Sequence, residues 1–544
     1  AGTPAALATS VGRFDHCTCK AGATTDAGSG TIPAQAAVGV ECRSAPSPDP
    51  NGYRPMDVTK SRTADPTRIR ADVVVIAVAD PPGTPTGPLA AVDAALGGLV
   101  SSVIKDGEVT GKAGQVRVLH TRGDIPAARV LLVGVGADPD RAAWASAGAA
   151  AARAARDLGA AKAALVAGDD IDAGDLRAMA EGLATGAWRL DAFRSGKRDA
   201  SQGRPSQIVV AGTIKPADVL RVQATAEAIG LARELSETPA NHMTPRMLAA
   251  RAEKVAAGSR NLSIEVLGPR ELTRLKAGAL MAVAQGSAEP AAMIVMRYRP
   301  SKGVKKGKEV LGLVGKGVTF DTGGISIKPS AGMEEMKMDM AGGAAVIAAM
   351  GLIAEMQVPG EVLAVVPTTE NMPSSTAMKP GDVFTAMNGK TIEVTNTDAE
   401  GRLILADALT YASRKGATRM MDMATLTGAI VVAIGDVYAG LFGSDPAFTQ
   451  LVRDAGDDTG DLCWPMPLHP GYDPLVKSAV ADLSNSAKKR QAGAVYAARF
   501  LRDFTEGKPW CHVDVAGTAM NGDHATGFGV RLAADVAERV ARLR

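Results

Sequence analysis

Residues 310–315 read VLGLVG, and the nine residues that follow, 316–324, read KGVTFDTGG. A short aliphatic run of this kind is typical of a strand buried inside a sheet. Lys316 and Asp321 come directly after it. The carboxyl end of a buried strand is where α/β folds gather their ligands. The stretch therefore predicts both a fold class and the place of a site.

Outward from this strand, short apolar runs alternate with helical stretches along the chain. The runs lie at 263–267, 291–298, 309–314, 361–366 and 419–425, and, nearer the N-terminus, at 72–79, 129–136, 162–167 and 207–211. Strand and helix in alternation imply a parallel sheet covered by helices. We predict an α/β protein, with a mixed, mainly parallel sheet flanked by helices in its C-terminal part.

The length of 544 residues exceeds what one core supports, because single cores stop growing at about 250–300 residues. We place a boundary within the long helical stretch 216–236. This predicts a smaller N-terminal α/β domain at 71–230 and a larger α/β domain at 231–544. Residues 1–70 are rich in small and polar residues without a hydrophobic period, which is typical of a disordered extension.

Composition excludes several classes of protein. A net charge of +2 does not indicate a nucleic-acid partner, although a basic patch stays open. The chain has no run of about 18 uncharged apolar residues, so we expect no membrane span. Five cysteines in a chain this long favour a reducing compartment, with the cytosol as the default. A removed targeting peptide also stays open.

Charged residues continue to accumulate after the strand. The set is Asp321, Asp339, Asp398 and Glu400 against Lys316, Lys328 and Arg402. In IEVTNTDAEGRL (392–403), Asp398, Glu400 and Arg402 occupy every second position. Side chains two apart in an extended backbone point the same way, so we expect these three to face one site.

Four carboxylates exceed what three cations hold without strain, whereas two divalent ions would offset them. Salt bridges within the set are the simpler alternative. Oxygen ligands without His or Cys favour Mn, Mg, Co or Zn. A phosphate-binding loop fails on spacing, since Val310 and Gly317 stand where Gly and Ser or Thr are required.

These segments closely resemble the leucyl (cytosol) aminopeptidase family of two-metal exopeptidases. The resemblance covers about residues 72–544, and NTDAEGRL (396–403) is the family's most specific signature. It is also strong in GKGVTFDTGGISIKP, MKMDMAGGAAV, TTENMPS and DMATLTGA. The first 70 residues match nothing in the family, and SNSAKKRQAG (484–493) is more basic than the glycine-rich stretch expected there.

The resemblance implies the ligands of two divalent ions, Mn or Zn, with Mg or Co as alternatives. The tighter ion would take Lys316, Asp321, Asp339 and Glu400, and the exchangeable ion Asp321, Asp398 and Glu400. It also implies attack by a metal-bridging hydroxide on the first peptide carbonyl. Lys328 would stabilise the oxyanion, and a bicarbonate held by Arg402 would shuttle the proton.

The resemblance further implies peptide substrates with a free N-terminus and an apolar side-chain pocket. Met336, Thr425, Gly428 and Ala516 would line that pocket, which would prefer Leu and tolerate other apolar residues. A homohexamer is implied as well. A DNA-binding or regulatory protein on the same scaffold is the alternative function. His242, His469, His512, His524, Asp407, Asp482 and Asp514 are interpreted as ordinary packing or surface residues.

Overall fold

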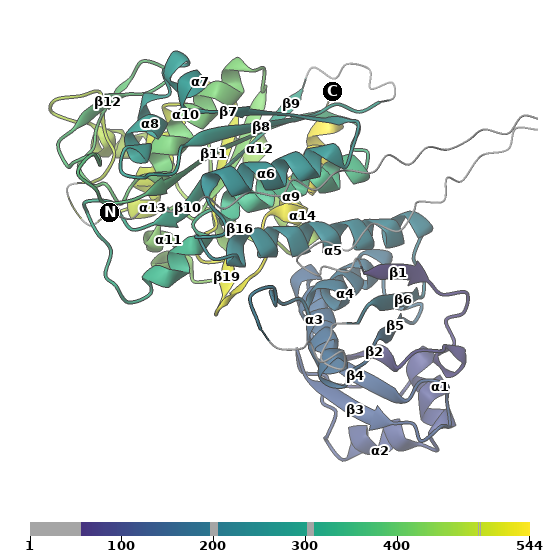
Figure 1. Cartoon of the computed structure of the whole chain (residues 1–544). Helices are drawn as coiled ribbons and strands as arrows, with labels where there is room; N and C mark the ends of the chain where they lie inside the picture. Colours follow the sequence, from purple (N-terminus) through teal and green to yellow (C-terminus); the bar gives the residue numbers. More distant parts are fainter. Residues whose placement is uncertain (1–55, 196–204, 302–308, 488, 490, 544) are drawn as a thin grey trace, which may run out of the picture. The chain divides into compact units, whose positions relative to one another are not determined.

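The computed structural model of the chain describes residues 56–195, 205–301, 309–487, 489 and 491–543. Two large sheets organise this part of the chain, one built from its N-terminal portion and one from its C-terminal portion (Figure 1). The α/β class predicted from the alternating runs is confirmed.

The first sheet has six strands in the order β1-β6-β5-β2-β4-β3. Their bounds are β1 (Asp57–Lys60), β2 (Val73–Ala79), β3 (Val116–His120), β4 (Arg129–Gly136), β5 (Lys162–Val166) and β6 (Gln207–Ala211). Neighbouring strands are parallel except β3, which is antiparallel to β4. Five helices accompany them: α1 (Gly87–Ala95), α2 (Leu99–Lys105), α3 (Arg141–Asp157), α4 (Ala173–Thr185) and α5 (Pro216–Glu237).

The strands of this sheet are buried on both faces. In β2, Val73 and Val75 belong to one core, and Val74 and Ile76 to the core on the opposite face. This is why the strand reads as a continuous apolar run instead of an alternating one. α5 begins in the first of these cores and ends in a core of the second sheet.

β1 corrects one expectation about the N-terminus. Val58 in β1 is buried and pairs in register with Ile208 of β6. The prediction of disorder over residues 1–70 is therefore wrong for residues 56–70, while residues 1–55 lie outside the described part. The strand was missed because DVTK carries a single apolar residue, and its structure depends on β6, about 150 residues away.

The second sheet has nine strands and is mixed but mainly parallel, as predicted. Its order is β16-β15-β18-β14-β9-β11-β8-β7, with β10 also paired to β11. The bounds are β7 (Leu262–Leu267), β8 (Ala292–Tyr298), β9 (Val310–Gly315), β10 (Gly317–Asp321), β11 (Glu361–Asn371), β14 (Arg419–Ala424), β15 (Ala439–Gly443), β16 (Cys463–Pro465) and β18 (Trp510–Asp514). The four central strands β18, β14, β9 and β11 are mutually parallel, so their carboxyl ends meet at one edge.

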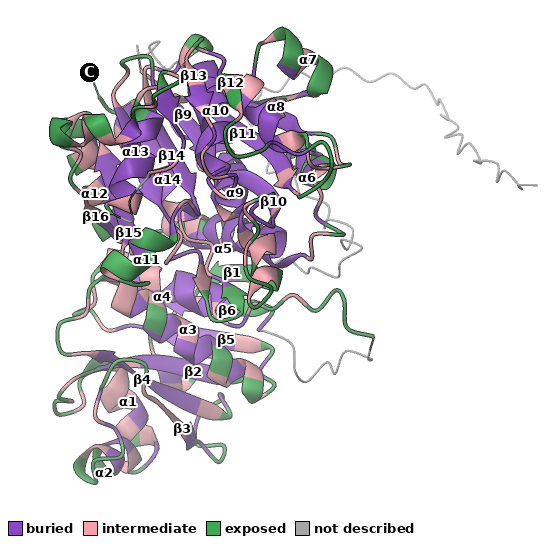
Figure 2. Ribbon diagram, turned by 90° about the vertical axis from the view of Figure 1, so that its left-hand side faces the viewer, coloured by how far each residue is buried: buried purple, intermediate pink, exposed green. Residues whose placement is uncertain are grey.

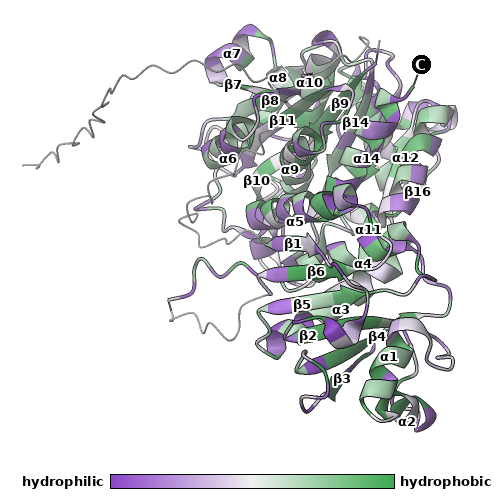
Figure 3. Ribbon diagram, turned by 90° about the vertical axis from the view of Figure 1, so that its right-hand side faces the viewer, coloured by the Kyte–Doolittle hydropathy of each residue, from purple (hydrophilic) through white to green (hydrophobic). Residues whose placement is uncertain are grey.

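Helices cover both faces of the second sheet (Figure 1). The helices of this portion are α6 (Pro245–Ala257), α7 (Pro269–Arg274), α8 (Gly278–Ala284), α9 (Ala341–Glu355), α10 (Gly401–Arg414), α11 (Gly428–Ile434), α12 (Pro446–Thr459), α13 (Gly493–Arg502) and α14 (Val530–Ala541), with the 3₁₀ turns η3 (Met333–Met338) and η4 (Pro470–Val476), whereas the turn η1 (Pro66–Arg68) contacts α1 in the N-terminal portion. In β9, Leu311 and Leu313 pack with α9 and α14, while Val314 packs with α10. The central strands are accordingly hydrophobic and buried (Figures 2 and 3).

Two small sheets complete the described structure. One contains β12 (Val383–Thr385), β13 (Thr391–Glu393) and β17 (Leu483–Ser484), and the other β19 (Met520–Asn521) and β20 (His524–Ala525). β13 and β17 are parallel. This pairing places Asn485 beside Glu393 and Thr395: Asn485 N donates to the Glu393 carbonyl, and Thr395 N donates to Asn485 Oδ1.

η3 and α9 together are long and apolar enough to cross a membrane. Among the described residues, they form the one stretch with this property, Met333–Glu355, and 78% of its most apolar window is buried inside the protein. The bent pair α1 and α2 would share the property only if counted as one span. The packing of α9 against the central strands is that of a core helix.

Candidate metal centre

Lys316 lies between β9 and β10, at the carboxyl edge of the central strands. Its backbone N–H donates to the Met423 carbonyl in β14 at 3.0 Å, and its carbonyl accepts from Gly343 N in α9 at 2.7 Å. Gly342 is needed for this close packing, because a Cβ there would lie 2.1 Å from the Met423 oxygen. Two strands and the first turn of α9 thus fix the lysine's backbone.

The Lys316 ammonium is fully enclosed by acceptors. Nζ lies 2.7 Å from Asp339 Oδ2 and 2.9 Å from Glu400 Oε1, and donates to the Thr425 carbonyl at 2.9 Å. Burial by itself lowers the pKa of Lys316, but the surrounding carboxylates more than offset this and raise it. In the metal-free structure these partners place Lys316 in an ion-pair network with Asp339 and Glu400.

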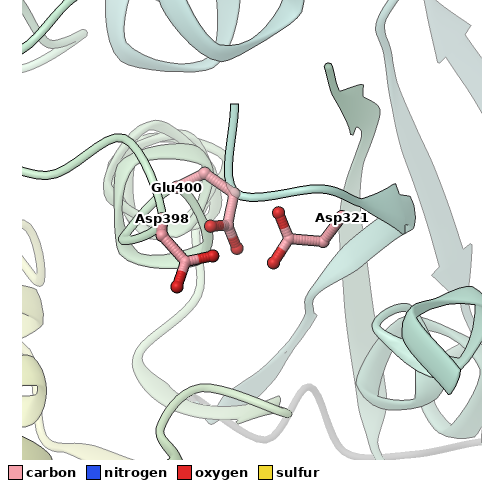
Figure 4. Close-up of side chains that lie close together, drawn as sticks. All are labelled: Asp321, Asp398 and Glu400. Atoms are coloured by element: carbon pink, nitrogen blue, oxygen red, sulfur yellow. The ribbon is translucent and has the colours of Figure 1, made fainter. Parts of the chain in front are cut away.

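Asp321, Asp398 and Glu400 converge on one point (Figure 4). One oxygen of each carboxylate lies within 4.8 Å of the other two. Burial, and then the charge of Glu400, raise the pKa of Asp398 to about 6 and also raise the pKa of Asp321. For Glu400, burial raises the pKa, but Lys316 and Lys328 outweigh it and hold it below the usual value. Three carboxyl groups this close repel one another and demand positive charge.

Lys328 approaches the same carboxylates from the half-buried side. Its Nζ lies 2.8 Å from Asp321 Oδ2 and forms a short ion pair with Asp398 Oδ1. Burial lowers the pKa of Lys328, and the carboxylates raise it further than burial lowers it. Lys328 therefore stands as a cation at the more accessible side of the cluster.

Asp339, at the end of η3, is the fourth carboxylate. Its Oδ1 accepts a hydrogen bond from Thr425 Oγ1 at 2.8 Å, and its buried Oδ2 pairs with Lys316 Nζ at 2.7 Å. Burial raises its pKa well above the usual value. This buried oxygen lies beside the acidic cluster, where it is a candidate ligand atom. The residues present therefore fit divalent cations, which prefer such oxygen donors.

Asn371, at the end of β11, contacts the cluster although the sequence interpretation gave it no role. Its side-chain Nδ2 donates to Asp321 Oδ1 at 2.8 Å and to the Thr397 carbonyl at 3.1 Å, and lies 3.4 Å from Glu400 Oε2. The signal for it in the sequence is its position, since TTEN places a polar side chain at the end of a buried strand beside Asp321.

The extended geometry expected for Asp398, Glu400 and Arg402 is wrong. Residues 397 and 398 form a turn, Glu400 has helical dihedrals (φ −73°, ψ −36°), and α10 begins at Gly401. The two carboxylates converge because a turn followed by a helix start brings them together, not because of strand alternation. Gly401 is required at this point, since a Cβ there would lie 2.8 Å from Lys316 Nζ.

Arg402 lies in the first turn of α10 and is buried. One guanidinium nitrogen donates to the Asn485 carbonyl at 2.7 Å, and the guanidinium lies over the Tyr496 ring, 5.6 Å from its centroid. Its Nε is buried without a hydrogen-bond partner. Burial lowers the pKa of Arg402. The structure thus holds this cation away from direct contact with a carboxylate.

The predicted pocket residues occupy three segments. Thr425 contacts Asp339 directly, Gly428 starts α11, and Met336 lies in η3 one turn before Asp339. Ala516 N and the backbone N–H groups of residues 426 and 427 all donate to Asp514 Oδ1, at 3.2–3.4 Å. Asp514 therefore links the segment after β14 to the segment after β18.

The other interpreted residues lie outside this cluster. His512 Nδ1 is 2.6 Å from Asp422 Oδ1 in the core, His242 stacks against Phe193, and His469 accepts from Gly471 N. Asp407 accepts from the backbone N–H groups of Leu280 and Met387.

Both portions of the chain match one protein family. Residues 230–534 match the catalytic domain of the cytosol aminopeptidase family, and residues 74–197 match its N-terminal domain. The chain belongs to the cytosol aminopeptidase family.

Individual relatives agree with this assignment. A protein of Solibacter usitatus named probable cytosol aminopeptidase is 48% identical over 418 residues, which cover 76% of this chain and 86% of the relative. One of the same name from Alkalilimnicola ehrlichii is 40% identical over 459 residues, covering 81% and 91%.

Solved structures agree as well. A tomato leucine aminopeptidase mutant is 33% identical with a TM-score of 0.81, covering 89% of this chain and 96% of that one. The bottromycin maturation enzyme BotP in complex with Mn is 34% identical with a TM-score of 0.76, covering 87% and 100%. The chain is a metal-dependent aminopeptidase, a hydrolase that acts on peptides. The comparisons give no support to a DNA-binding function.

Proposed function

We propose that this aminopeptidase releases N-terminal residues from peptides, with Leu preferred and other apolar residues tolerated, by means of two divalent ions. The observation that carries the proposal is the convergence of Asp321, Asp398 and Glu400 beside Lys316, which also contacts the buried carboxylate of Asp339. With Lys316 as the neutral amine and Lys328 as a cation, the four carboxylates still exceed the charge of one divalent ion, which favours a pair.

In this proposal each ion has its own ligand set. Lys316, Asp321, Asp339 and Glu400 hold the tighter ion, and Asp321, Asp398 with its backbone carbonyl, and Glu400 hold the exchangeable one. Asp321 and Glu400 then serve both. Lys316 would ligate only as the neutral amine, so it would give up its proton when the ion binds. Mn or Zn suits these ligands, with Mg or Co as alternatives, and BotP, one of the structural neighbours, is described in complex with Mn.

Bound divalent ions would supply Lewis-acid polarisation of the peptide carbonyl and an activated water as nucleophile. Lys328 stabilises the negative charge that develops on the carbonyl oxygen, which its position on the accessible side of the cluster supports. Arg402, with an unpartnered buried Nε, would hold a bicarbonate, which would supply a proton shuttle for the leaving amine. The free α-amine of the substrate sits at the Asp398 side, which restricts cleavage to the first peptide bond.

Substrate choice is assigned to a pocket formed by Met336, Thr425, Gly428 and Ala516. Hydrogen bonds of Asp339 and Asp514 hold these segments together, which supports a pocket that they line jointly. Discrimination by one methylene in an apolar pocket is worth only about 1–3 kcal/mol, so the enzyme tolerates several apolar side chains.

We also propose a homohexamer that works in the cytoplasm. Exposed apolar side chains on and after α11, including Val432 at 90% exposure and Val437 at 62%, support an assembly that covers them (Figure 2). Cys463 and Cys511 are buried free thiols, which fits a reducing compartment.

The test is hydrolysis of a leucine anilide by metal-stripped protein after addition of Mn²⁺, Zn²⁺, Co²⁺ or Mg²⁺. We expect activity to return with metal in the wild type and not in Glu400→Ala. The neighbouring Glu370→Gln is the matched control, because Glu370 pairs with Ser287 and not with the cluster. A folded wild-type protein that releases no leucine with any of these ions would overturn the proposal.

A further inference from the structure

We propose that Asn371 is a positioning residue that orients the two carboxylates shared between the ions, Asp321 and Glu400, and so sets the metal affinity of the centre. The inference rests on the proposed function. Asn371 is 2% exposed and lies at the last position of β11, next to β10. Its amide is the neutral hydrogen-bond donor that touches both carboxylates.

The amide helps to fix the orientation in which the Asp321 carboxylate faces the ions. Asp321 Oδ1 accepts from Asn371 Nδ2 at 2.8 Å and from Gly323 N at 2.8 Å, so both of its lone pairs are engaged. Oδ2 is left for a cation, and Lys328 Nζ contacts this atom at 2.8 Å. Rotation of the carboxyl group would break both Oδ1 bonds. Asn371 and Gly323 therefore hold Oδ2 toward the position of positive charge.

The same amide joins two ligand-bearing segments that are distant in the sequence. Besides Asp321 on β10, it donates to the Thr397 carbonyl at 3.1 Å, in the turn that carries Asp398 and leads to Glu400. The backbone carbonyl of Asn371 accepts from Thr322 N at 3.0 Å and from Thr322 Oγ1 at 2.8 Å. Without the side chain, the β10 end and the 397–400 turn lose this direct link.

An amide suits this position better than a charged donor. Lys or Arg would orient the carboxylates equally well, but its charge would repel two divalent ions. A neutral donor fixes ligand geometry without that repulsion. Residues that orient metal ligands through hydrogen bonds typically contribute about 10- to 100-fold to metal affinity or activity.

The experiment measures Mn²⁺ binding to metal-stripped protein by titration calorimetry, together with the urea unfolding midpoint in the absence of metal. The variants are Asn371→Ala and Asn371→Ser. The serine variant is included in case the alanine variant fails to fold, because serine fills more of the space left by the amide. Asn388→Ala is the control, since the Asn388 amide donates to the Asp503 carbonyl, outside the cluster. We expect each Mn²⁺ dissociation constant to rise about 10- to 100-fold in the Asn371 variants and to stay unchanged in the control.

Wild-type Mn²⁺ affinity in either folded Asn371 variant would overturn the inference. This holds even if the urea unfolding midpoint fell, because Asn371 would then support the fold without affecting metal binding. Failure of the wild-type protein itself to bind Mn²⁺, Zn²⁺ or Co²⁺ would instead overturn the proposed function. The two failures are thus separate.

Discussion

Gly401 leaves the space in which the Lys316 side chain lies: a Cβ at position 401 would be 2.8 Å from both Cε and Nζ of Lys316. The Lys316 side chain cannot move aside without losing contacts, because Asp339, Glu400 and the Thr425 carbonyl hold its ammonium group. One hydrogen-sized side chain at the start of α10 therefore determines where a cation of the centre sits.

Gly401→Ala tests this relationship. The added methyl group should displace Lys316 and lower kcat/KM and Mn²⁺ affinity at least about tenfold. It should also lower the free energy of unfolding of the metal-free protein by about 1–3 kcal/mol, because the methyl group overpacks a buried site. Titration calorimetry and anilide hydrolysis measure the effects. Gly83→Ala is the control, as a Cβ there has no atom within 4 Å. Full metal affinity in Gly401→Ala would show that Lys316 has more freedom than its contacts indicate.

Lys328→Met should separate catalysis from metal binding. Loss of the ammonium should reduce kcat by about 10²–10³-fold, the usual effect of removing an oxyanion donor. Metal affinity should be unchanged or tighter, because the lysine no longer competes for Asp321 Oδ2 and Asp398 Oδ1. Steady-state kinetics measures kcat, and calorimetry measures the metal affinity. Lys379→Met, at an exposed ion pair, is the control. Parallel losses of both would contradict this division.

Asp407 should make the unfolding free energy depend on pH. Burial raises its pKa to about 7, against backbone hydrogen bonds that lower it. The folded state therefore binds more protons than the unfolded state between about pH 4 and 7, and stability falls as pH rises through that window. The slope is at most about 1.4 kcal/mol per pH unit for one group.

Urea unfolding at pH 5, 6, 7 and 8 measures this dependence. Asp407→Asn should remove that part of the slope, and the difference from wild type isolates Asp407 from other groups. Asp482→Asn serves as control, because hydrogen bonds from Thr391 lower the pKa of Asp482 and place its titration below the window. Identical slopes in wild type and Asp407→Asn would refute the assignment.

Gly428→Phe should change specificity without harming the fold. A Cβ at Gly428 meets no atom within 4 Å, so a side chain can begin there without a backbone clash. If this position lines the pocket, KM for a leucine anilide should rise about 10-fold or more while an alanine anilide is affected less. An equal effect on both substrates, measured by steady-state kinetics, would remove Gly428 from the pocket.

The sequence predicted the features that depend on local pattern. The aliphatic run at 310–315 identified the central strand, and the charges that follow identified the candidate ligands. Both signals are strong because a buried strand must be apolar and a buried charge must have a partner.

Features that depend on distant contacts were not predictable in this way. β1 forms only because β6 offers an edge, and Asn371 acts only through residues brought to it by the fold. The convergence of Asp398 and Glu400 was predicted for the wrong reason, since alternation in the sequence does not distinguish an extended segment from a turn that enters a helix.

The contact between Lys316 Nζ and the Thr425 carbonyl spans 109 residues of chain, and β14, which precedes Thr425, is held between β9 and β18. During synthesis, a ribosome-bound chain that lacks β14 and β18 already carries every proposed metal ligand, but it lacks the Thr425 carbonyl that holds the Lys316 ammonium and the two strands that extend the sheet on this side of β9. We therefore expect the centre to become competent only after β18 has been synthesised, so that a growing chain carries its ligands before it can cleave peptides.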